Sequence, residues 1–346
     1  MRKTLSIIAL GAVILALVIL PSLGLAAGTP VKLGLGHITS IGNSKDLGVD
    51  AKGNVVPPMA QVDSIIAAVA FDEAGKVVNI TLDSAQSKIN FNKDFTVSND
   101  LAAKGLTKVE LGDAYGMRKG SAIGKEWHEQ IAELEKWMTG KTVAEIKALK
   151  VKARDAAHPA VPDVPELTSS VTMTVQDYIA AVEKAWNNAV PVVAGGEKLG
   201  LGHEVSIAKS KPAAAQVDTS VAAALFDKDG KVVGVAIDAI QSKVPFDGKT
   251  GKVTADRSAL VKSKVELGNA YGMAKASSIG KDWYEQSAEL GKWMVGKTVK
   301  EIQGLKVKQV NASHVAVPDV PELTSQVTIT VESYLFAVGE AYDNAK

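Results

Sequence analysis

Hydroxyl side chains gather directly before the start of an expected helix at two places in the sequence. Residues 162–189 read PDVPELTSSVTMTVQDYIAAVEKAWNNA, and residues 318–345 repeat them as PDVPELTSQVTITVESYLFAVGEAYDNA. The amides and the dipole at a helix N-terminus favour negative charge, so hydroxyls placed there suit an anionic ligand. The simpler interpretation is a strand, a turn and a helix whose hydroxyls only cap the helix.

A threonine in each of these stretches stands where the helix is expected to begin. Thr174 is the predicted N-cap of the first helix, with Asp177 at the position of a capping-box acid. Thr330 is the predicted N-cap of the second, where Ser333 replaces the acid. Apolar side chains then recur at helical spacing and give each helix one apolar face. In the first helix they are Tyr178, Ile179, Val182 and Trp186.

Four of the five histidines occupy equivalent places in the two halves of the chain: His37 with His203, and His158 with His314. Two histidines per half could bind a metal or a haem. However, no carboxylate or second histidine stands at ligand spacing beside any of them. The favoured interpretation is a surface or capping histidine, so no metal ligand is predicted and the role of these residues is left open.

A loop rich in glycine and small polar residues precedes the first long helix of each half. It contains Tyr115, Gly116 and Met117 in the first half and Tyr271, Gly272 and Met273 in the second. Two such loops facing the hydroxyl-rich helix starts could enclose a flat phosphorylated ligand. The sequence has no Ser/His/Asp order, no Walker motif and no GxGxxG, so a secreted hydrolase lacks its catalytic constellation.

Composition limits the class of protein further. The 346 residues are 46% hydrophobic and 22% charged, as in folded globular domains. A net charge of +1 without a basic block does not favour nucleic acid as a partner. The absence of cysteine excludes disulfides, thiolate metal sites, thiol catalysis and c-type haem attachment.

The first residues have the pattern of an export signal. Arg2 and Lys3 precede an uncharged apolar run at residues 5–20, and small residues follow Pro21. We predict a signal peptide at residues 1–27, with cleavage after Ala26 or Ala27. An uncleaved anchor is the alternative, but the run is short for a membrane span. The mature chain is therefore expected to be extracytoplasmic, secreted or associated with the cell envelope, without a membrane span.

The mature chain is a tandem repeat. Residues 110–117 (ELGDAYGM) return as 266–273 (ELGNAYGM), and residues 33–37 (LGLGH) return as 199–203. A repeat this long indicates two duplicated domains rather than a solenoid. We place copy 1 at residues 30–190, a linker at 191–197 and copy 2 at 198–346. Each copy has its own apolar strands and helices, so the copies are predicted to fold separately.

Within one copy, strands precede helices. Residues 62–71 and 76–82 are apolar and flank a turn, which predicts a hairpin, and residues 88–91 are a candidate third strand. Helices are predicted at residues 124–138 and 142–149, the second capped by Thr142. Three prolines are expected to keep residues 159–165 extended. The predicted fold class is α+β, in which each copy is a small antiparallel sheet with helices packed on one side.

This layout resembles the FMN-binding domain of extracytoplasmic electron-transfer proteins, such as the flavin-carrying subunits of sodium-pumping quinone reductases. In that family the last hydroxyl of a motif D-G-x-[ST]-G-A-[ST] is esterified to FMN by a flavin transferase. Residues 166–172 (ELTSSVT) and 322–328 (ELTSQVT) fall in the same register. The resemblance implies that Thr172 and Thr328 are the flavin-bearing positions. It also implies that Ser169 and Ser325 are the inner hydroxyls.

The resemblance implies an exported FMN-binding electron carrier with two flavin-domain copies. Its expected partners are redox proteins or a quinone-linked membrane donor, together with a flavin transferase. Ser170 and Gln326 replace the motif's second glycine, so the attachment of FMN is left open between covalent and non-covalent. The alternative is a non-enzymatic cell-surface or envelope module that keeps the fold without flavin. A carrier of this kind needs no catalytic residue, because the cofactor supplies the redox chemistry.

Overall fold

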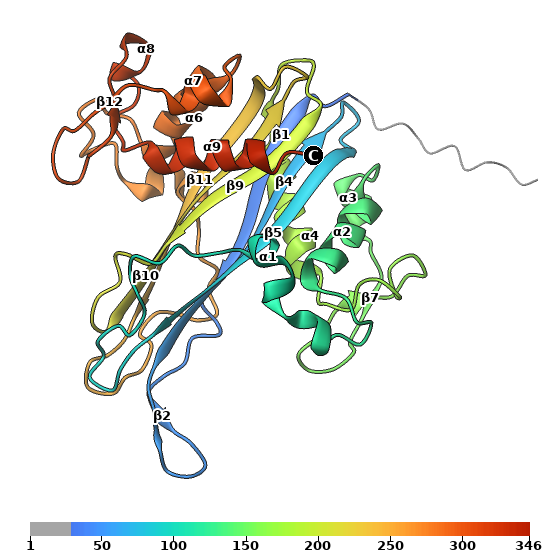
Figure 1. Cartoon of the computed structure of the whole chain (residues 1–346), viewed down its shortest axis with the longest axis vertical. Coiled ribbons are helices and arrows are strands. Elements are labelled where there is room, and N and C mark those ends of the chain that lie inside the picture. The colour runs from blue at the N-terminus through green and yellow to red at the C-terminus, as the bar shows by residue number, and fades with distance from the viewer. Residues whose placement is uncertain (1–28) are drawn as a thin grey trace, which may run out of the picture.

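The computed structural model describes residues 29–346, so the expected signal peptide at residues 1–27 lies outside the described part of the chain. Two groups of helices lie on opposite sides of a set of long strands (Figure 1). Each half of the chain supplies one group of helices and its own antiparallel sheet. The predicted α+β fold with a duplicated domain is therefore confirmed.

The elements of copy 1 run from β1 to β8. They are β1 (Lys32–Ser40), β2 (Gly48–Val49), β3 (Val55–Val56), β4 (Met59–Phe71), β5 (Val77–Asn90), α1 (Lys108–Leu111), the 3₁₀ helices η1 (Gly112–Tyr115) and η2 (Met117–Lys119), α2 (Trp127–Met138), α3 (Val143–Lys147), β6 (Val151–Lys152), β7 (Val161–Pro162), α4 (Gln176–Asn187) and β8 (Val190–Pro191).

Copy 2 repeats most of this order. Its elements are β9 (Lys198–Ser206), β10 (Ala214–Phe226), β11 (Val232–Pro245), α5 (Lys264–Leu267), the 3₁₀ helix η3 (Gly268–Tyr271), α6 (Trp283–Met294), α7 (Val299–Gln303), β12 (Val307–Lys308), β13 (Val317–Pro318), α8 (Pro321–Thr324) and α9 (Glu332–Asp343). The hairpin β2–β3 belongs to the stretch between His37 and Ala60 that is longer in copy 1.

The first three strands of the two main sheets follow the same antiparallel order, and the sheet of copy 1 has β8 as a fourth strand. The full order is β5-β4-β1-β8 in copy 1 and β11-β10-β9 in copy 2. Lys32 pairs with Phe71 and Ser40 with Asp63, so every residue of β1 is paired with β4 of the hairpin. The repeated LGLGH segment thus forms the third strand of each sheet. The predicted third strand at residues 88–91 is wrong, because these residues continue the long strand β5.

Two glycines of β1 allow a helix to lie directly on the sheet. A Cβ atom at Gly34 would overlap the carbonyl of Ala185, and one at Gly36 would overlap that of Ala181, both in α4. Leu33 alternates with these glycines and is fully buried on the opposite face, in a cluster that contains residues of both copies. The LGLGH repeat therefore encodes a strand with a helix on one face and a second sheet on the other.

Each copy has one apolar core between its sheet and its helices. In copy 1 the fully buried Leu134 and Met138 of α2 meet Val182 of α4 and Val69 of β4. The corresponding core of copy 2 includes Leu290 and other buried residues of α6, α9 and the sheet. These cores use the apolar helical faces that the sequence periodicity predicts.

Two further apolar clusters contain residues of both copies. One joins Leu33 and Ile66 to Leu199 and Val221, and the other includes Ile89 together with residues of β9, β10 and β11. The order of layers is therefore helices, sheet, sheet, helices, with apolar surface shared between the two sheets (Figure 1). The prediction that the copies fold separately was made from the strands and helices of each copy, without these apolar contacts between the copies.

The segments before α4 and α9 differ from their predicted conformation. The stretch at residues 159–165, predicted to be extended, is a strand only at β7, and residues 164–170 form a bend and turns. In copy 2, Pro321 begins the short helix α8, because proline is well suited to the first turn of a helix. Val175 and Val331 are the N-caps, so the predicted caps Thr174 and Thr330 are wrong by one residue. Within residues 29–346, neither threonine hydroxyl has a hydrogen-bond partner.

Thr142, by contrast, caps α3 as predicted, with Glu145 completing the capping box. Among the described residues, no helix combines the length and hydrophobicity that a membrane crossing requires.

Candidate functional site

Copy 2 contains a cavity of about 490 Å³ between its sheet and the start of α9. Strands β10 and β11 contribute Ser220 and Ile240, and the segment leading into α9 contributes Ile329 and Thr330. This volume falls within the range of about 300–1,000 Å³ that is common for small-molecule sites. The cavity therefore can accept an organic molecule with a ring system.

Aromatic side chains form one wall of this cavity. Trp283 is 2% exposed, and its ring lies 5.7 Å from that of Tyr334 at an angle of 66°. The Lys264 ammonium lies 5.1 Å from the Tyr271 ring centre and 5.2 Å from the Trp283 ring centre. Burial raises the pKa of Tyr334, so its phenol stays protonated at neutral pH. The wall is thus aromatic, with a lysine ammonium over two of its rings.

The cavity also has many polar side chains in its lining, and one of them lacks a partner in the described chain. Ser220 Oγ donates to Ser333 Oγ over 3.0 Å, and Lys209 Nζ lies 2.8 Å from Asp218 Oδ2. The buried hydroxyl oxygen of Thr330 has no hydrogen-bond partner in the described chain. A buried hydroxyl without a partner costs about 1–3 kcal/mol. A ligand with a donor or an acceptor at this point would relieve that cost.

The sequence-predicted loop residues reach this cavity in copy 2. Tyr271 and Met273 line it, and Gly272 lies between them with φ 76°, a left-handed conformation that glycine adopts readily. Lys264, Trp283 and Tyr334, which the sequence analysis did not single out as ligand contacts, line it as well. The loop and the segment before α9 therefore come together, as the sequence pattern suggests.

Copy 1 has the same framework with different side chains at the cavity. Tyr115, Gly116 and Met117 correspond to the loop of copy 2, and Lys108 lies 4.8 Å from the Tyr115 ring centre. Ile65 stands at the position of Ser220 and packs against the core of copy 1. Asp177 stands at the position of Ser333. A branched apolar side chain thus takes the place of a small hydroxyl residue.

The two threonines at the expected flavin-bearing position are held by glutamines. Thr328 N and Oγ1 donate to Gln286 Oε1 over 2.8 and 3.2 Å. Thr172 N and Oγ1 donate to Gln130 Oε1 over 2.9 and 3.3 Å. These hydroxyls therefore already have an acceptor in the protein. Ser169 and Ser325, the expected inner hydroxyls, are exposed.

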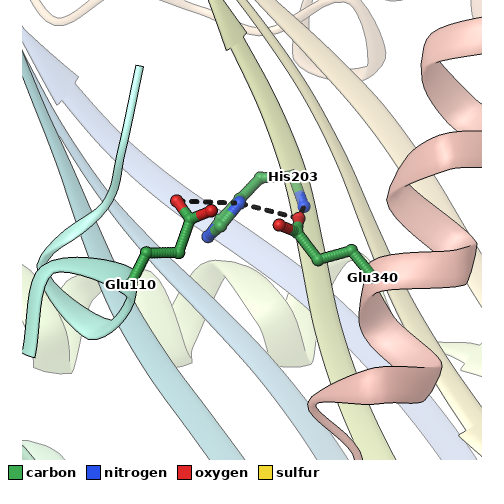
Figure 2. A group of neighbouring side chains, drawn as sticks. All are labelled: Glu110, His203 and Glu340. Carbon is green, nitrogen blue, oxygen red and sulfur yellow. Dashed lines mark hydrogen bonds and ion pairs between the residues drawn. The ribbon is translucent and has the colours of Figure 1, made fainter. Parts of the chain in front are cut away.

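A second cluster of chemical groups lies at the boundary between the copies. His203 of β9 is 2% exposed, and its Nδ1 lies 2.9 Å from Glu340 Oε2 and 4.0 Å from Glu110 Oε2. On the other side of the ring, Nε2 lies 3.0 Å from Asp83 Oδ2. Figure 2 shows Glu110, His203 and Glu340 converging from α1, β9 and α9. Lys104 Nζ lies 3.3 Å from Glu110 Oε1 and 3.6 Å from Glu340 Oε1.

The carboxylates control the protonation of this histidine. Burial alone would lower the pKa of His203, but its hydrogen bonds to Asp83 and Glu340 raise that pKa to about 10. The pKa of Glu340 is lowered: burial opposes the shift, but its bonds to His203 prevail. At neutral pH the group is therefore an imidazolium among three carboxylates.

The equivalent position in copy 1 is built differently. His37 Nε2 lies 2.9 Å from Glu266 Oε2, and Lys184 forms an ion pair with the same carboxylate. Lys184 stands where copy 2 has Glu340, so a cation replaces an anion. Burial would raise the pKa of Glu266, but its bonds to His37 and Lys184 lower it to about 2.

The histidines thus divide into two kinds. His158 is partly exposed and His314 is exposed, and they bond to Asp155 and Asn311 in turns, in line with the expected surface or capping role. His37 and His203 are buried, so that interpretation is wrong for them. Their carboxylate partners lie far away in the sequence, and ligand spacing along the chain could not reveal them.

Comparisons with known proteins give one partial similarity. No protein family model matches the chain, and no solved structure matches it. A protein named chlorophenol reductase from Desulfitobacterium hafniense is 37% identical over 100 residues. The match covers 26% of this chain and 31% of that protein, so the chain spans less than a third of the relative's length.

Proposed function

We propose that this chain is an exported electron-transfer protein that holds FMN in the cavity of copy 2. The observation that carries the proposal is the cavity of about 490 Å³ with Trp283 and Tyr271 in its wall and the unpartnered hydroxyl of Thr330. These groups suit a flat aromatic ring system that carries polar substituents. When bound, FMN would supply the transfer of electrons, which the protein's own side chains do not provide.

The residues of the cavity have distinct roles in this proposal. The Trp283 and Tyr271 rings provide a flat surface that excludes water from one side of the ligand. The Lys264 ammonium, which lies beside both rings, stabilises negative charge on the ligand or on its reduced form. The Thr330 hydroxyl orients a polar group of the ligand by a hydrogen bond.

The proposed attachment is non-covalent. Thr328 Oγ1 donates to Gln286 Oε1, and Gln326 stands where the family motif has glycine. A branched or long side chain there crowds the close backbone approach that a glycine allows. We therefore assign the ligand contacts to the cavity residues rather than to Thr172 and Thr328.

The location and partners belong to the same proposal. An export signal at residues 1–27 would place the protein outside the cytoplasm, where it could accept electrons from a quinone-linked membrane donor and pass them to another redox protein. The partial similarity to a protein named for a reductase activity is in keeping with a redox role.

The direct test is to prepare residues 29–346 with excess FMN, remove free FMN by gel filtration and record the absorbance spectrum. A yellow protein whose colour is bleached by dithionite and released by denaturation would support the carrier and its non-covalent attachment. Ser220→Ile should abolish binding, because it places the larger copy 1 side chain in the cavity. The reverse exchange, Ile65→Ser, is the matched control and should leave binding in copy 2 intact.

Two outcomes would redirect the proposal. Colour that survives denaturation in protein made with a flavin transferase, and disappears in Thr328→Ala, would show covalent attachment. A colourless protein with both FMN and transferase present would refute the carrier and favour a binding or structural module that keeps the fold without flavin.

A further inference from the structure

The geometry points to a binding site for one divalent transition-metal ion, with Zn²⁺ as the best match, formed by Glu110, His203 and Glu340 across the boundary of the two copies (Figure 2). The inference stands independently of the FMN proposal, because the two sites share no residue.

The three ligand atoms are close enough to share one ion. One carboxylate oxygen of each glutamate and Nδ1 of His203 all lie within 4.8 Å of one another. Zinc bonds of about 2.0–2.2 Å place neighbouring ligand atoms roughly 3–3.5 Å apart. The present separations from Nδ1, 2.9 Å to Glu340 and 4.0 Å to Glu110, bracket that spacing. Small side-chain movements would therefore complete a three-ligand site with a position left for water.

The surrounding hydrogen bonds hold the ligands in place. Asp83 Oδ2 lies 3.0 Å from His203 Nε2 and fixes the ring so that Nδ1 faces the glutamates. This carboxylate–histidine–metal arrangement is common in metal sites and makes the imidazole a better ligand. Asp83 is itself held by the backbone N–H of Ser84 and Val109, at 2.6 and 3.2 Å.

Backbone donors also orient the two glutamates. Glu110 Oε2 accepts from Thr107 N over 2.8 Å as part of the capping box of α1. Glu340 Oε2 accepts from His203 N, which is free to donate because β9 is the edge strand of its sheet. Fixed ligands reduce the entropy cost of ordering a site around an ion.

The charges leave room for a cation. Asp83, Glu110 and Glu340 carry three negative charges, against one on the His203 imidazolium and one on Lys104. Lys104 binds the Oε1 atoms of the glutamates and its side chain is 45% exposed, so it leaves the Oε2 atoms and Nδ1 to the ion. On binding, the proton on Nδ1 is released to solvent and the metal takes its place.

Copy 1 provides a natural comparison for this site. His37 and Glu266 correspond to His203 and Glu110, but Lys184 replaces Glu340. A lysine ammonium has no lone pair for a metal and already neutralises Glu266. Among the three ligand positions, only the exchange of Lys184 for Glu340 separates the copies, although His37 turns Nε2 rather than Nδ1 toward its glutamate and bonds to Thr39 through Nδ1.

The test is calorimetric titration of Zn²⁺ into chelator-treated residues 29–346. We expect one ion per chain and an increase in melting temperature, because the ion links Glu110 of copy 1 to His203 and Glu340 of copy 2. Mg²⁺ should not compete, because it prefers oxygen ligands to imidazole. Absence of Zn²⁺ binding, or equal competition by Mg²⁺, would overturn the inference.

Substitutions that put the residue of one copy at the equivalent position of the other copy test where the ion binds. Glu340→Lys gives copy 2 the charge of copy 1 and should abolish binding, and Glu340→Gln serves if the lysine variant fails to fold. Lys184→Glu should create a second site and raise the stoichiometry to about two. Asp83→Asn should weaken binding about 10–100-fold while keeping the stoichiometry. Unchanged binding in both Glu340 variants, or no second ion in a folded Lys184→Glu protein, would contradict the assignment.

Discussion

The two buried histidines occupy the same strand position in the two copies, yet different charged groups surround them. His37 and Lys184 both contact Glu266, so a lysine stands beside this histidine. His203 lies among Asp83, Glu110 and Glu340. The half-exposed side chain of Lys104 contacts Glu110. The two copies therefore share one backbone framework, while substitutions at equivalent positions give them different chemistry.

The cavity of copy 2 and the equivalent positions of copy 1 differ in a similar way. Copy 2 has Ser220 and Ser333 where copy 1 has Ile65 and Asp177, although the lysine, the tryptophan and the Tyr-Gly-Met loop are kept. Both candidate sites thus depend on residues of copy 2 whose equivalents in copy 1 differ, and Glu110 of copy 1 completes the metal site. We therefore interpret copy 2 as the copy that supplies most of the ligand contacts.

The largest expected effect comes from separating the copies. Residues 29–190 and 197–346 each carry one side of the shared apolar clusters, so each fragment alone would expose the inner face of its sheet. We expect fragments that aggregate or unfold alone and regain a cooperative melt when they are refolded together. Two fragments that each melt cooperatively without the other would show that the shared surface is dispensable.

The close contact between sheet and helix should respond alike in both copies. Gly34→Val and Gly200→Val each drive a side chain into the backbone of α4 or α9. We expect each to cost about 3 kcal/mol or more in denaturant unfolding, at the upper end for overpacked sites. Gly248→Ala is the matched control, since a Cβ there meets nothing within 4 Å in the described chain. A much smaller cost in copy 1 than in copy 2 would break the equivalence.

Substitution of the two buried histidines should have different effects on stability. His203→Gln leaves Asp83 and Glu340 without their common cation, and breaking such a buried pair costs about 3–5 kcal/mol. His37→Gln should cost less, because Glu266 keeps its ion pair with Lys184. Chemical unfolding of both variants at neutral pH measures the difference, and equal costs would contradict the contrast between the two networks.

The smallest effect is a dependence on pH that comes from Glu266 of copy 2, which binds His37 of copy 1. The pKa of Glu266 is about 2 in the folded protein, below its usual value of about 4.3 when unfolded. The carboxylate therefore stabilises the fold fully above about pH 4.5, and this stabilisation is lost as the pH falls toward 2. Glu266→Gln should flatten the decline of melting temperature between these values. An identical decline in the variant would rule out this carboxylate as a source.

The sequence predicts the parts of the fold that depend on local periodicity. The apolar spacing of Trp127, Ile131, Leu134 and Met138 predicts α2, and the hairpin β4–β5 follows from two apolar runs around a turn. It does not predict β1 and β9, because the glycines of LGLGH lower strand propensity. Only the approach of α4 and α9 to those glycines explains why the strands need them.

The sites depend on contacts that local patterns do not record. The Tyr-Gly-Met loop and Thr330 were singled out from composition and register, and the structure brings Tyr271, Met273 and Thr330 to one cavity. Glu110, His203 and Glu340 meet only because two sheets pack face to face, and no spacing along the chain encodes that. The exchange of Lys184 for Glu340 was visible in the repeat, but its meaning required the location of the histidine.

The most direct test of the central claim is the amount of FMN bound per chain at saturation, measured from absorbance and protein mass after gel filtration. We predict one FMN per chain in the unaltered protein, none in Ser220→Ile, and one in Ile65→Ser or, if that exchange opens a cavity in copy 1, two. Saturation without any bound FMN, or one FMN retained in a folded Ser220→Ile protein, would contradict the placement of the cofactor in copy 2.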